Sequence, residues 1–383
     1  MPEAGPSLTS LASIATPALA LDLEKFERNC ARMIDRCRSL GVGLRPHMKT
    51  LKSIEAARSA IDPLHGGIAV STLREADYFA RQGIADIQYA VCITPDKLSR
   101  AAALMRLAPR VSVFIDSIEV AEAVAAFAVT NEAALRVWIE IDSGEHRTGL
   151  EPDDPRLTQI AAILGRSPAE LAGVATHGGH SYAARDAGAI AAIADQERLA
   201  VVEAAGRLRK AGFEVPGVSA GSTPTAVHMR SGEGLTEIRA GVYMTGDLFQ
   251  VGIGSQDVED IAASVVATVI SHKPERNQIV VDAGGLALSK DRSTAALPEQ
   301  DMGYGLVVDL EGRPAYGRLI VAGVHQEHGE IQGEEPLPFD RLPIGSRVRI
   351  LPNHACMTTA AHDRYLVTEG AMVRAEWEKV AGW

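Results

Sequence analysis

The sequence predicts an α/β fold in which a (β/α)8 TIM-like barrel is followed by a second, mostly β domain. Over the first two-thirds of the 383 residues, short apolar runs alternate with longer alanine-rich amphipathic segments, which is the pattern of βαβ units. Eight such runs at this spacing fit one closed barrel of roughly 250 residues better than an open sheet. From Asp260 onward, strand-like runs rich in Gly and Pro replace the long helices.

The predicted strands of the barrel are short apolar runs. They cover residues 41–45, 67–70, 87–90, 111–115, 137–141, 171–176, 217–220 and 237–240. Longer segments with helical periodicity lie before or between them, at residues 23–40, 72–82, 118–128, 156–164 and 187–211. Asp22 is the expected N-cap of the first helix, because its carboxylate can accept a free amide of the first turn.

The change in composition places the domain boundary near residues 250–258. We expect residues 12–254 to form the barrel. Residues 255–383, alone or together with residues 1–11, form the β-rich domain, which begins with strand-like segments at 261–272 and 278–282. A short apolar run at 18–22 can serve as a strand in either part.

The composition excludes several classes of partner. A formal net charge of −11 disfavours nucleic acid, which is bound mainly through Lys and Arg, and disfavours an anionic membrane surface. Four cysteines are too few for a disulfide framework in so long a chain. The amino terminus lacks the basic region of a signal peptide, and no apolar run approaches the roughly 20 residues of a membrane helix. We therefore expect a cytoplasmic protein.

Lys49 follows the first predicted strand, in the segment Arg45-Pro-His-Met-Lys-Thr50. Pro46 favours an extended backbone at Arg45, which places Lys49 just beyond the strand, on the barrel face that carries active sites. Arg45 and His47 can lower the pKa of the lysine, as a Schiff-base lysine requires. The alternative is a solvated surface lysine.

The ends of the later strands also carry polar residues. The fifth strand leads into Asp142–Gly149, the sixth into Thr176–Tyr182, and the eighth into Arg239–Tyr243, with Asp247 beyond it. After the seventh strand, Gly221-Ser222-Thr223 can present amides and hydroxyls to a phosphate at the start of a helix. The alternative for this loop is an ordinary helix N-cap.

His354 and Cys356 are two residues apart in the second domain, so on an extended segment both side chains lie on one face. An imidazole and a thiolate suit zinc or a similar metal, with open positions left for water and substrate. The alternative is a histidine that is hydrogen-bonded within the protein, next to a buried free cysteine.

Six motifs in order along nearly the whole chain carry a resemblance to a known family. They are 45–50, 176–182 and 221–225 in the barrel, and Val281-Asp-Ala-Gly, Gln326-Glu-His-Gly and Leu351-Pro-Asn-His-Ala-Cys in the second domain. Together they resemble the fold-type III pyridoxal-phosphate enzymes of the D-serine dehydratase and D-threonine aldolase family, which have an alanine racemase type barrel. Cys356 favours the dehydratases, since the aldolases tend to carry Asp there. Asp142–Gly149 and Trp377–Trp383 are most similar to the branch that acts on D-threo-3-hydroxyaspartate.

The resemblance implies a role for each motif. Lys49 holds pyridoxal 5'-phosphate (PLP) and then acts as the base at Cα, while a divalent metal (zinc, manganese or cobalt) binds His354 and Cys356. The expected cofactor contacts are Lys49, Arg147, His177, Tyr182, Gly221, Ser222, Thr223, Gly241 and Tyr243. Glu327 and His328 are expected near the substrate or the metal ligands. A homodimer is expected as well.

The implied reaction is elimination of water from a β-hydroxy D-amino acid, either D-threo-3-hydroxyaspartate or D-serine, to give a 2-keto acid and ammonia. A retro-aldol cleavage of D-threonine or 3-hydroxy-D-aspartate at the same site is the main alternative. An amino-acid racemase would need a second base, for which Tyr304 and Tyr316 are candidates. A non-catalytic PLP-binding protein is usually a lone barrel, and this chain has a second domain.

Overall fold

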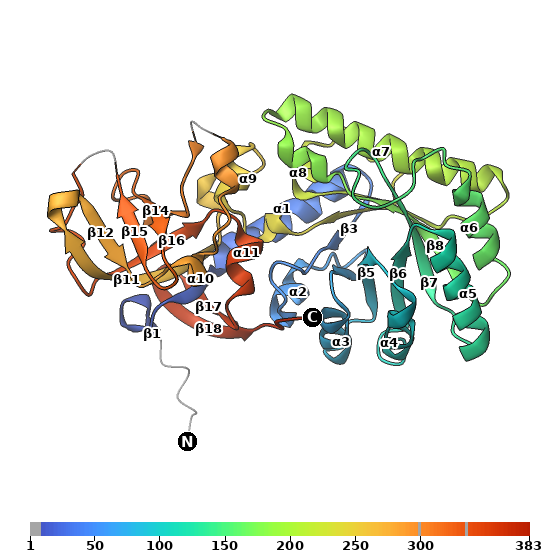
Figure 1. Cartoon of the computed structure of the whole chain (residues 1–383), viewed down its shortest axis with the longest axis horizontal. Coiled ribbons are helices and arrows are strands. Elements are labelled where there is room, and N and C mark those ends of the chain that lie inside the picture. Colours follow the sequence, from blue (N-terminus) through green and yellow to red (C-terminus); the bar gives the residue numbers. More distant parts are fainter. Residues whose placement is uncertain (1–8, 298–299, 334–335) are drawn as a thin grey trace, which may run out of the picture. The chain divides into compact units, whose positions relative to one another are not determined.

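The computed structural model describes residues 9–297, 300–333 and 336–383 (Figure 1). The chain forms two compact units, each considered by itself below. One unit consists of Ala31–Gly241 with the last two residues, and the other joins the described residues up to Cys30 to Val242–Ala381.

The first unit is an eight-stranded parallel barrel, as the sequence predicts. Its strands follow the order β3-β10-β9-β8-β7-β6-β5-β4. A bridge between His47 and Ala69 brings the two ends together, and the Met48 amide donates to the Ala69 carbonyl at 2.8 Å. The strands are β3 (Gly43–Pro46), β4 (Ile68–Val70), β5 (Asp86–Cys92), β6 (Arg110–Ile115), β7 (Arg136–Ile141), β8 (Glu170–Thr176), β9 (Gly217–Ala220) and β10 (Glu237–Ala240). All eight predicted strands are confirmed.

Helices alternate with these strands. They are α1 (Leu23–Ser39, which spans both units), α2 (Ile54–Ala60), α3 (Leu73–Arg81), α4 (Leu98–Leu104), α5 (Ile118–Asn131), α6 (Arg156–Leu164), α7 (Ala187–Lys210) and α8 (Thr223–His228). Side chains of Thr72, Ser117 and Asp186 accept amides in the first turns of α3, α5 and α7. The five predicted helices are confirmed. The sequence did not predict α2 and α4, because seven residues are too few for a clear helical period.

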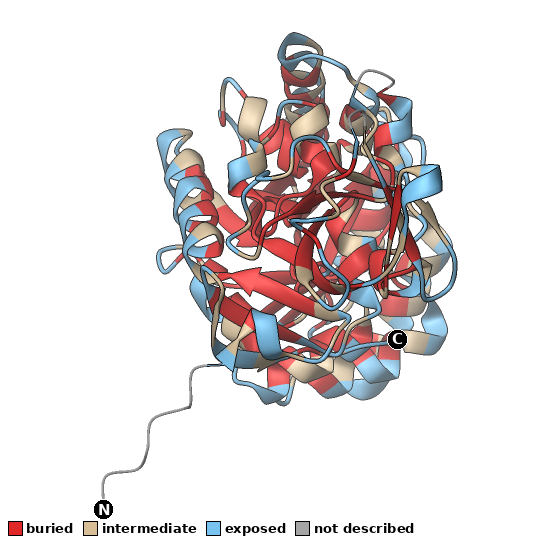
Figure 2. Ribbon diagram, turned by 90° about the vertical axis from the view of Figure 1, so that its left-hand side faces the viewer, coloured by how far each residue is buried: buried red, intermediate tan, exposed pale blue. Residues whose placement is uncertain are grey.

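The barrel interior contains both apolar and ionic layers. Phe114 and Trp138 are buried and pack with small alanines of β8. In the ionic layer, Arg45 of β3 binds Glu237 of β10 at 2.8 Å and Asp86 of β5 at 2.7 Å. All three side chains are almost fully buried. Figure 2 shows that the strands are mostly buried while the outer helix faces are exposed. The ionic contacts explain why β3 and β10 carry charged residues at inward positions.

The second unit is built on a ten-stranded, mostly antiparallel sheet. Six of its strands, β11, β12, β15, β14, β13 and β16, close on themselves because β16 also pairs with β11. Strand β11 continues the sheet through β2, β17, β18 and β1. The strands are β1 (Thr9–Ser10), β2 (Ala18–Asp22), β11 (Ala263–Lys273), β12 (Gln278–Val281), β13 (Gly305–Val308), β14 (Ile320–Val324), β15 (Gly329–Gln332), β16 (Arg347–Pro352), β17 (Arg364–Glu369) and β18 (Met372–Glu378).

Short helices connect these strands. The α-helices are α9 (Leu248–Gly252), α10 (Gly285–Leu288) and α11 (Ala355–Ala360). Short 3-10 turns in the two units are Leu11–Ser13, Pro95–Lys97, Gly179–Ala183, Val242–Met244, Val258–Asp260, Pro274–Arg276 and Ser293–Ala296. No helix in the described part of the chain is both long and apolar enough to cross a bilayer.

The division of the chain differs from the expected ranges 12–254 and 255–383 at both ends of the barrel. The run at 18–22 is strand β2, which pairs with β11 and β17 in the second sheet. After β10 the chain passes at once into the second unit, at Val242. The β2 residues are apolar on both faces, as in a barrel strand, so the sequence pattern did not distinguish the two sheets.

Candidate functional site

Lys49 lies in the turn after β3, and its side chain is exposed. The Lys49 amide approaches Nδ1 of His47 at 3.4 Å. Burial lowers the pKa of His47 well below its usual range, and the positive charges of Lys49 and Arg239 lower it further. His47 is therefore a neutral neighbour of the lysine. Arg45 instead points into the ionic layer of the barrel, so it does not accompany Lys49 as the sequence suggested.

His177 follows β8 and forms a hydrogen bond from Nδ1 to the carbonyl oxygen of Gly221, at 2.9 Å. Because a carbonyl only accepts, Nδ1 carries the proton. Burial lowers the pKa of His177 to about 3, with a further contribution from the charge of Lys49, so the ring is neutral at physiological pH. Its Nε2 is then the unprotonated ring nitrogen.

Arg147 lies in the loop after β7, and it is about half exposed. Its guanidinium is 3.4 Å from Glu145 and 4.0 Å from Glu140. The charge of Arg147 also contributes to the lowered pKa of both His47 and His177. These electrostatic effects show that three of the predicted site residues, Lys49, Arg147 and His177, lie near one another and near His47.

The Gly221–Thr223 loop forms the N-cap of helix α8, which is one of the two interpretations of its sequence. Ser222 caps helix α8 through a hydrogen bond from the Thr225 amide, and a reciprocal bond from the Ser222 amide to the Thr225 hydroxyl completes a capping box. The Gly221 amide donates to Glu197 at 2.8 Å. The amides of Gly221 and Ser222 thus have partners within the protein, and a contact of this loop with a phosphate stays a prediction.

At two glycines of this region, Gly221 and Gly241, the backbone lies close to a neighbouring carbonyl oxygen. Gly221 has a φ of +127°, and a Cβ there would lie 2.5 Å from the carbonyl oxygen of Arg239. A Cβ on Gly241 would lie 2.7 Å from the carbonyl oxygen of His47. No larger residue fits either position without a backbone shift. Tyr182 is partly buried in the 3-10 turn that follows His177, and Tyr243 is buried just after Gly241, in the second unit.

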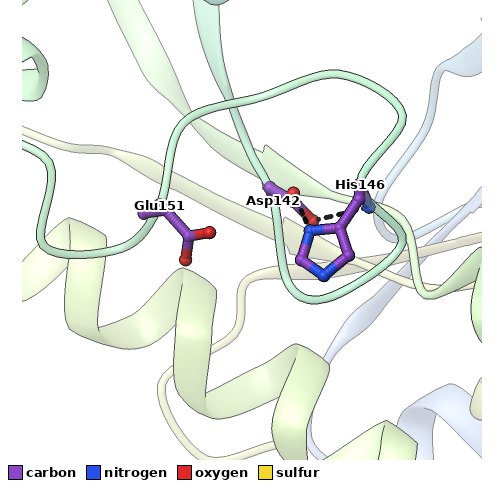
Figure 3. A group of neighbouring side chains, drawn as sticks. All are labelled: Asp142, His146 and Glu151. Carbon is purple, nitrogen blue, oxygen red and sulfur yellow. Dashed lines mark hydrogen bonds and ion pairs between the residues drawn. The ribbon is translucent and has the colours of Figure 1, made fainter.

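The loop after β7 contains a group of potential cation ligands that the sequence did not single out. Figure 3 shows Asp142, His146 and Glu151, whose ligand atoms lie within 4.8 Å of one another. The carboxylate of Asp142 accepts hydrogen bonds from the Gly144 amide at 2.8 Å and from the His146 amide at 3.1 Å. It also forms a hydrogen bond with Nδ1 of the His146 ring at 2.8 Å. These hydrogen bonds stabilise the conformation of the loop that contains Asp142.

In the second unit, His354 and Cys356 are brought together, but on a different backbone from the one expected. Strand β16 ends at Pro352, and His354 is the extended N-cap residue of α11, so Cys356 lies in the first turn of a helix. The strand prediction failed because the alternation of side chains in Leu351–Cys356 does not mark where a strand gives way to a helix. The two side chains still interact through a hydrogen bond.

Two aspartates complete the surroundings of His354. Asp291 Oδ2 lies 2.7 Å from His354 Nδ1, and Asp247 accepts the Ala355 amide at 2.9 Å. Burial opposes a charge on His354, but contacts with Cys356, Asp247 and Asp291 raise its pKa to about 10. Sequence reasoning missed Asp291, since no motif surrounds it. Glu327 accepts a hydrogen bond from its neighbour Gln326 at 3.2 Å, and a place for Glu327 and His328 near the substrate or the metal ligands stays a prediction.

The two tyrosines considered as racemase bases lie against cations. The guanidinium carbon of Arg292 is 5.4 Å from the ring centre of Tyr304, and that of Arg341 is 5.0 Å from the ring centre of Tyr316. Burial raises the pKa of Tyr316. A raised pKa disfavours Tyr316 as a base at neutral pH.

Comparison with known proteins agrees with this arrangement. Residues 21–248 match the model of the alanine racemase N-terminal domain, and residues 262–368 match that of a putative serine dehydratase domain. D-threo-3-hydroxyaspartate dehydratase from Delftia sp. (strain HT23) is 43% identical over 381 residues, which cover 98% of this chain and 99% of the relative. The chain belongs to the family of the D-threo-3-hydroxyaspartate and D-serine dehydratases. The resemblance inferred from the six motifs is confirmed.

A second relative and a solved structure are also similar to this dehydratase-family chain over nearly its whole length. D-serine dehydratase from Dictyostelium discoideum is 33% identical over 376 residues, covering 93% of each chain. A solved structure of D-threo-3-hydroxyaspartate dehydratase, a cysteine-to-alanine mutant in the metal-free form, has a TM-score of 0.93 at 42% identity and covers 98% of this chain and 100% of its own. The fold of a racemase-type barrel with a β domain is therefore confirmed.

Proposed function

We propose that this chain is a lyase, dependent on PLP and a divalent metal, that eliminates water from a β-hydroxy D-amino acid. D-threo-3-hydroxyaspartate is the first candidate substrate and D-serine the second. The observation that carries the proposal is the contact between His354 and Cys356 in a chain that is similar over its whole length to a D-threo-3-hydroxyaspartate dehydratase. That a relative is known as a cysteine-to-alanine mutant in a metal-free form supports a metal at this pair.

The barrel residues fit PLP. An exposed lysine, a neutral histidine and an arginine lie together, and the backbone beside them at Gly221 and Gly241 has no room for a Cβ. When bound, PLP supplies a ring that withdraws electrons and stabilises negative charge at Cα. Lys49 would hold the cofactor and later take the Cα proton on Nζ. We also propose Tyr182, Ser222, Thr223 and Tyr243 as contacts of the cofactor.

The charges near Lys49 suit this role. Arg147 would pair with an anionic oxygen of the cofactor, because its guanidinium keeps its charge at any physiological pH. His177 would lie against the cofactor ring without placing a second positive charge there, since its pKa is about 3. His47, also neutral, would lie next to the lysine.

The second unit fits a divalent metal. An imidazole and a thiol are ligands that zinc, manganese or cobalt accept, and Asp291 holds the remaining ring nitrogen of His354, as carboxylates do in many metal sites. When bound, the metal supplies a Lewis acid for the departing hydroxyl. Loss of the Cα proton and the β-hydroxide leaves an enamine, which water converts to the 2-keto acid and ammonia. A homodimer and a cytoplasmic location remain predictions from the sequence.

Product analysis tests this proposal. The purified protein, with PLP and a divalent metal, is incubated separately with D-threo-3-hydroxyaspartate, D-serine and D-threonine. We expect keto acid and ammonia in equal amounts, formed fastest from D-threo-3-hydroxyaspartate. Glycine with glyoxylate or acetaldehyde would overturn the dehydratase assignment in favour of an aldolase.

A further inference from the structure

Glu197 is a fully buried carboxylate in the middle of α7 that the proposed mechanism does not use. Its Oε1 accepts two backbone amides, from Gly178 at 2.6 Å and from Gly221 at 2.8 Å. Gly178 directly follows His177 after β8, and Gly221 follows β9. One oxygen of one helix residue therefore connects two of the loops at the end of the barrel strands.

The same two loops are joined by a second bond. His177 Nδ1 lies 2.9 Å from the carbonyl oxygen of Gly221. The peptide groups on both sides of Gly221 are thus held, one by Glu197 and the other by His177. Since Glu197 also holds the amide just after His177, the histidine, Gly221 and the carboxylate form a closed ring of contacts.

The packing leaves the ring little freedom. A Cβ on Gly178 would lie 3.0 Å from the carboxyl carbon of Glu197, and a Cβ on Gly221 would lie 2.5 Å from the Arg239 carbonyl. Both loops approach their partners as closely as glycine allows. Burial raises the pKa of Glu197 above its ordinary value, against the effects of the Thr225 hydroxyl and the two amides. A carboxyl in such surroundings needs its hydrogen bonds, because a buried acceptor without donors is costly.

We propose that Glu197 is a positioning residue, which fixes the Gly178 and Gly221 backbones so that His177 keeps Nδ1 on the Gly221 carbonyl. The consequence is one ring orientation and one neutral tautomer of His177. The inference rests on the proposed function in one respect, that the oriented imidazole ring would lie against the cofactor. The orientation itself can be measured whatever the enzyme catalyses.

Three substitutions separate the hydrogen bonds from the packing. Glu197→Gln keeps an oxygen that can accept both amides. Glu197→Leu has a similar size and no acceptor. Glu197→Asp keeps the carboxylate but withdraws it by one methylene, and it serves if the leucine variant does not fold. Glu203→Gln is the matched control, because Glu203 lies on the same helix, half exposed, and pairs with Arg207 at 3.0 Å.

The first readout is the 15N NMR spectrum of the full-length protein with labelled histidine, recorded with and without PLP. The His177 signals are identified by their loss in a His177→Gln variant. We expect the Nδ1-protonated neutral form in the wild type, in Glu197→Gln and in Glu203→Gln. Glu197→Leu or Glu197→Asp should show a substantial fraction of the Nε2-protonated form. A wild-type His177 signature in the leucine or aspartate variant would overturn the proposal.

The second readout is PLP affinity, followed by absorbance. Loss of both amide contacts should weaken PLP binding about tenfold or more in Glu197→Leu, whereas Glu197→Gln should remain within about threefold. Combined with His177→Ala, the leucine substitution should cost much less than the sum of the two effects, because it acts through the histidine. Additive effects would contradict a positioning role. If the protein did not bind PLP at all, the proposed function would fail while the tautomer result still decided this inference.

Discussion

Asp291 Oδ2 and His354 Nδ1 lie 2.7 Å apart, which orients the imidazole beside Cys356 from a position 63 residues earlier in the chain. Asp291 is itself held in place, since it accepts the Ser293 amide at 2.8 Å. A carboxylate on one ring nitrogen of a histidine leaves the other nitrogen as the ligand atom and raises its basicity. The pair thus explains how a helix N-cap residue can serve as a metal ligand.

Replacing Asp291 with Asn should weaken metal binding by about 10- to 100-fold without releasing the PLP. The physical reason is the loss of the charge that orients and polarises the His354 ring. Metal titrations of the chelated enzyme, followed by activity and metal content, measure the effect. Asp363→Asn, at an exposed position, is the control. An unchanged metal affinity would show that Asp291 does not act on the ligand.

Cys356→Ala should retain the cofactor absorbance, lose the bound metal and lose most of the activity. The thiolate is one of only two proposed protein ligands, so its removal leaves a single imidazole. Metal analysis after gel filtration, alongside a visible spectrum, separates the two outcomes. Wild-type rates in the presence of a strong chelator would refute a role for metal in the reaction.

Lys49→Ala should abolish both turnover and the visible absorbance of lysine-bound PLP. No other group is proposed to form the covalent link, and no other is proposed to take the Cα proton. Spectra and product assays on the same preparation test both points. Lys210→Ala, at the exposed C-terminal end of α7, is the control and should behave as the wild type. A remaining absorbance band in the Lys49 variant would show that a different lysine holds the cofactor.

The sequence predicted the barrel well because most of its strands are short apolar runs bounded by polar loops. Lys49 and Arg147 lie near His177, since the ends of parallel barrel strands lie on one face. Their roles at a cofactor stay predictions. His354 and Cys356 also meet as expected, although on a helix start instead of a strand. Local patterns were sufficient for these residues because each strand can be recognised from its own residues, and the barrel topology then places the strand ends on one face.

Other features depend on contacts that no local pattern records. Strand β2 joins the second sheet because of its pairing with β11, more than 240 residues away in sequence. Asp291 and Glu197 act on residues from distant elements, and their surrounding sequences are those of an ordinary turn and an ordinary helix. The amides of Gly221 and Ser222 are occupied by Glu197 and Thr225, which only the folded structure reveals.

The ionic layer of the barrel makes a prediction about stability. Glu237 binds Arg45 at 2.8 Å, His65 at 2.8 Å and the Ser219 hydroxyl at 2.7 Å. Glu237→Gln should destabilise the protein by about 3–5 kcal/mol, because the buried Arg45 would lose the negative charge that pairs with its guanidinium. Urea unfolding followed by circular dichroism measures the change.

The matched comparison is the double substitution Arg45→Met with Glu237→Leu. It removes this pair of charges, while Asp86 keeps its ion pair with Arg110. The double variant should cost less than Glu237→Gln alone, since replacing a buried ion pair by apolar groups is often nearly neutral. Glu203→Gln on the exposed face of α7 should change stability by less than about 0.5 kcal/mol. A double variant less stable than the single one would indicate that packing, more than charge, controls this layer.

His177 predicts a pH dependence of stability. Its pKa is lowered from 6.5 to about 3 in the folded protein, by burial first and by the charge of Lys49 next. As pH falls below 6.5 the unfolded state takes up a proton that the folded state does not, so unfolding becomes more favourable. This part of the stability is fully present above pH 6.5 and is lost progressively toward pH 3.

In the PLP-free protein, His177→Gln should therefore show a shallower loss of stability between pH 6.5 and about pH 4.5. Urea midpoints at constant ionic strength test the slope, with His325→Gln, an exposed histidine, as the control. Parallel curves for the wild type and His177→Gln would mean that the ring titrates alike in the folded and unfolded states, and that the neutral histidine of the candidate site is not held by the fold.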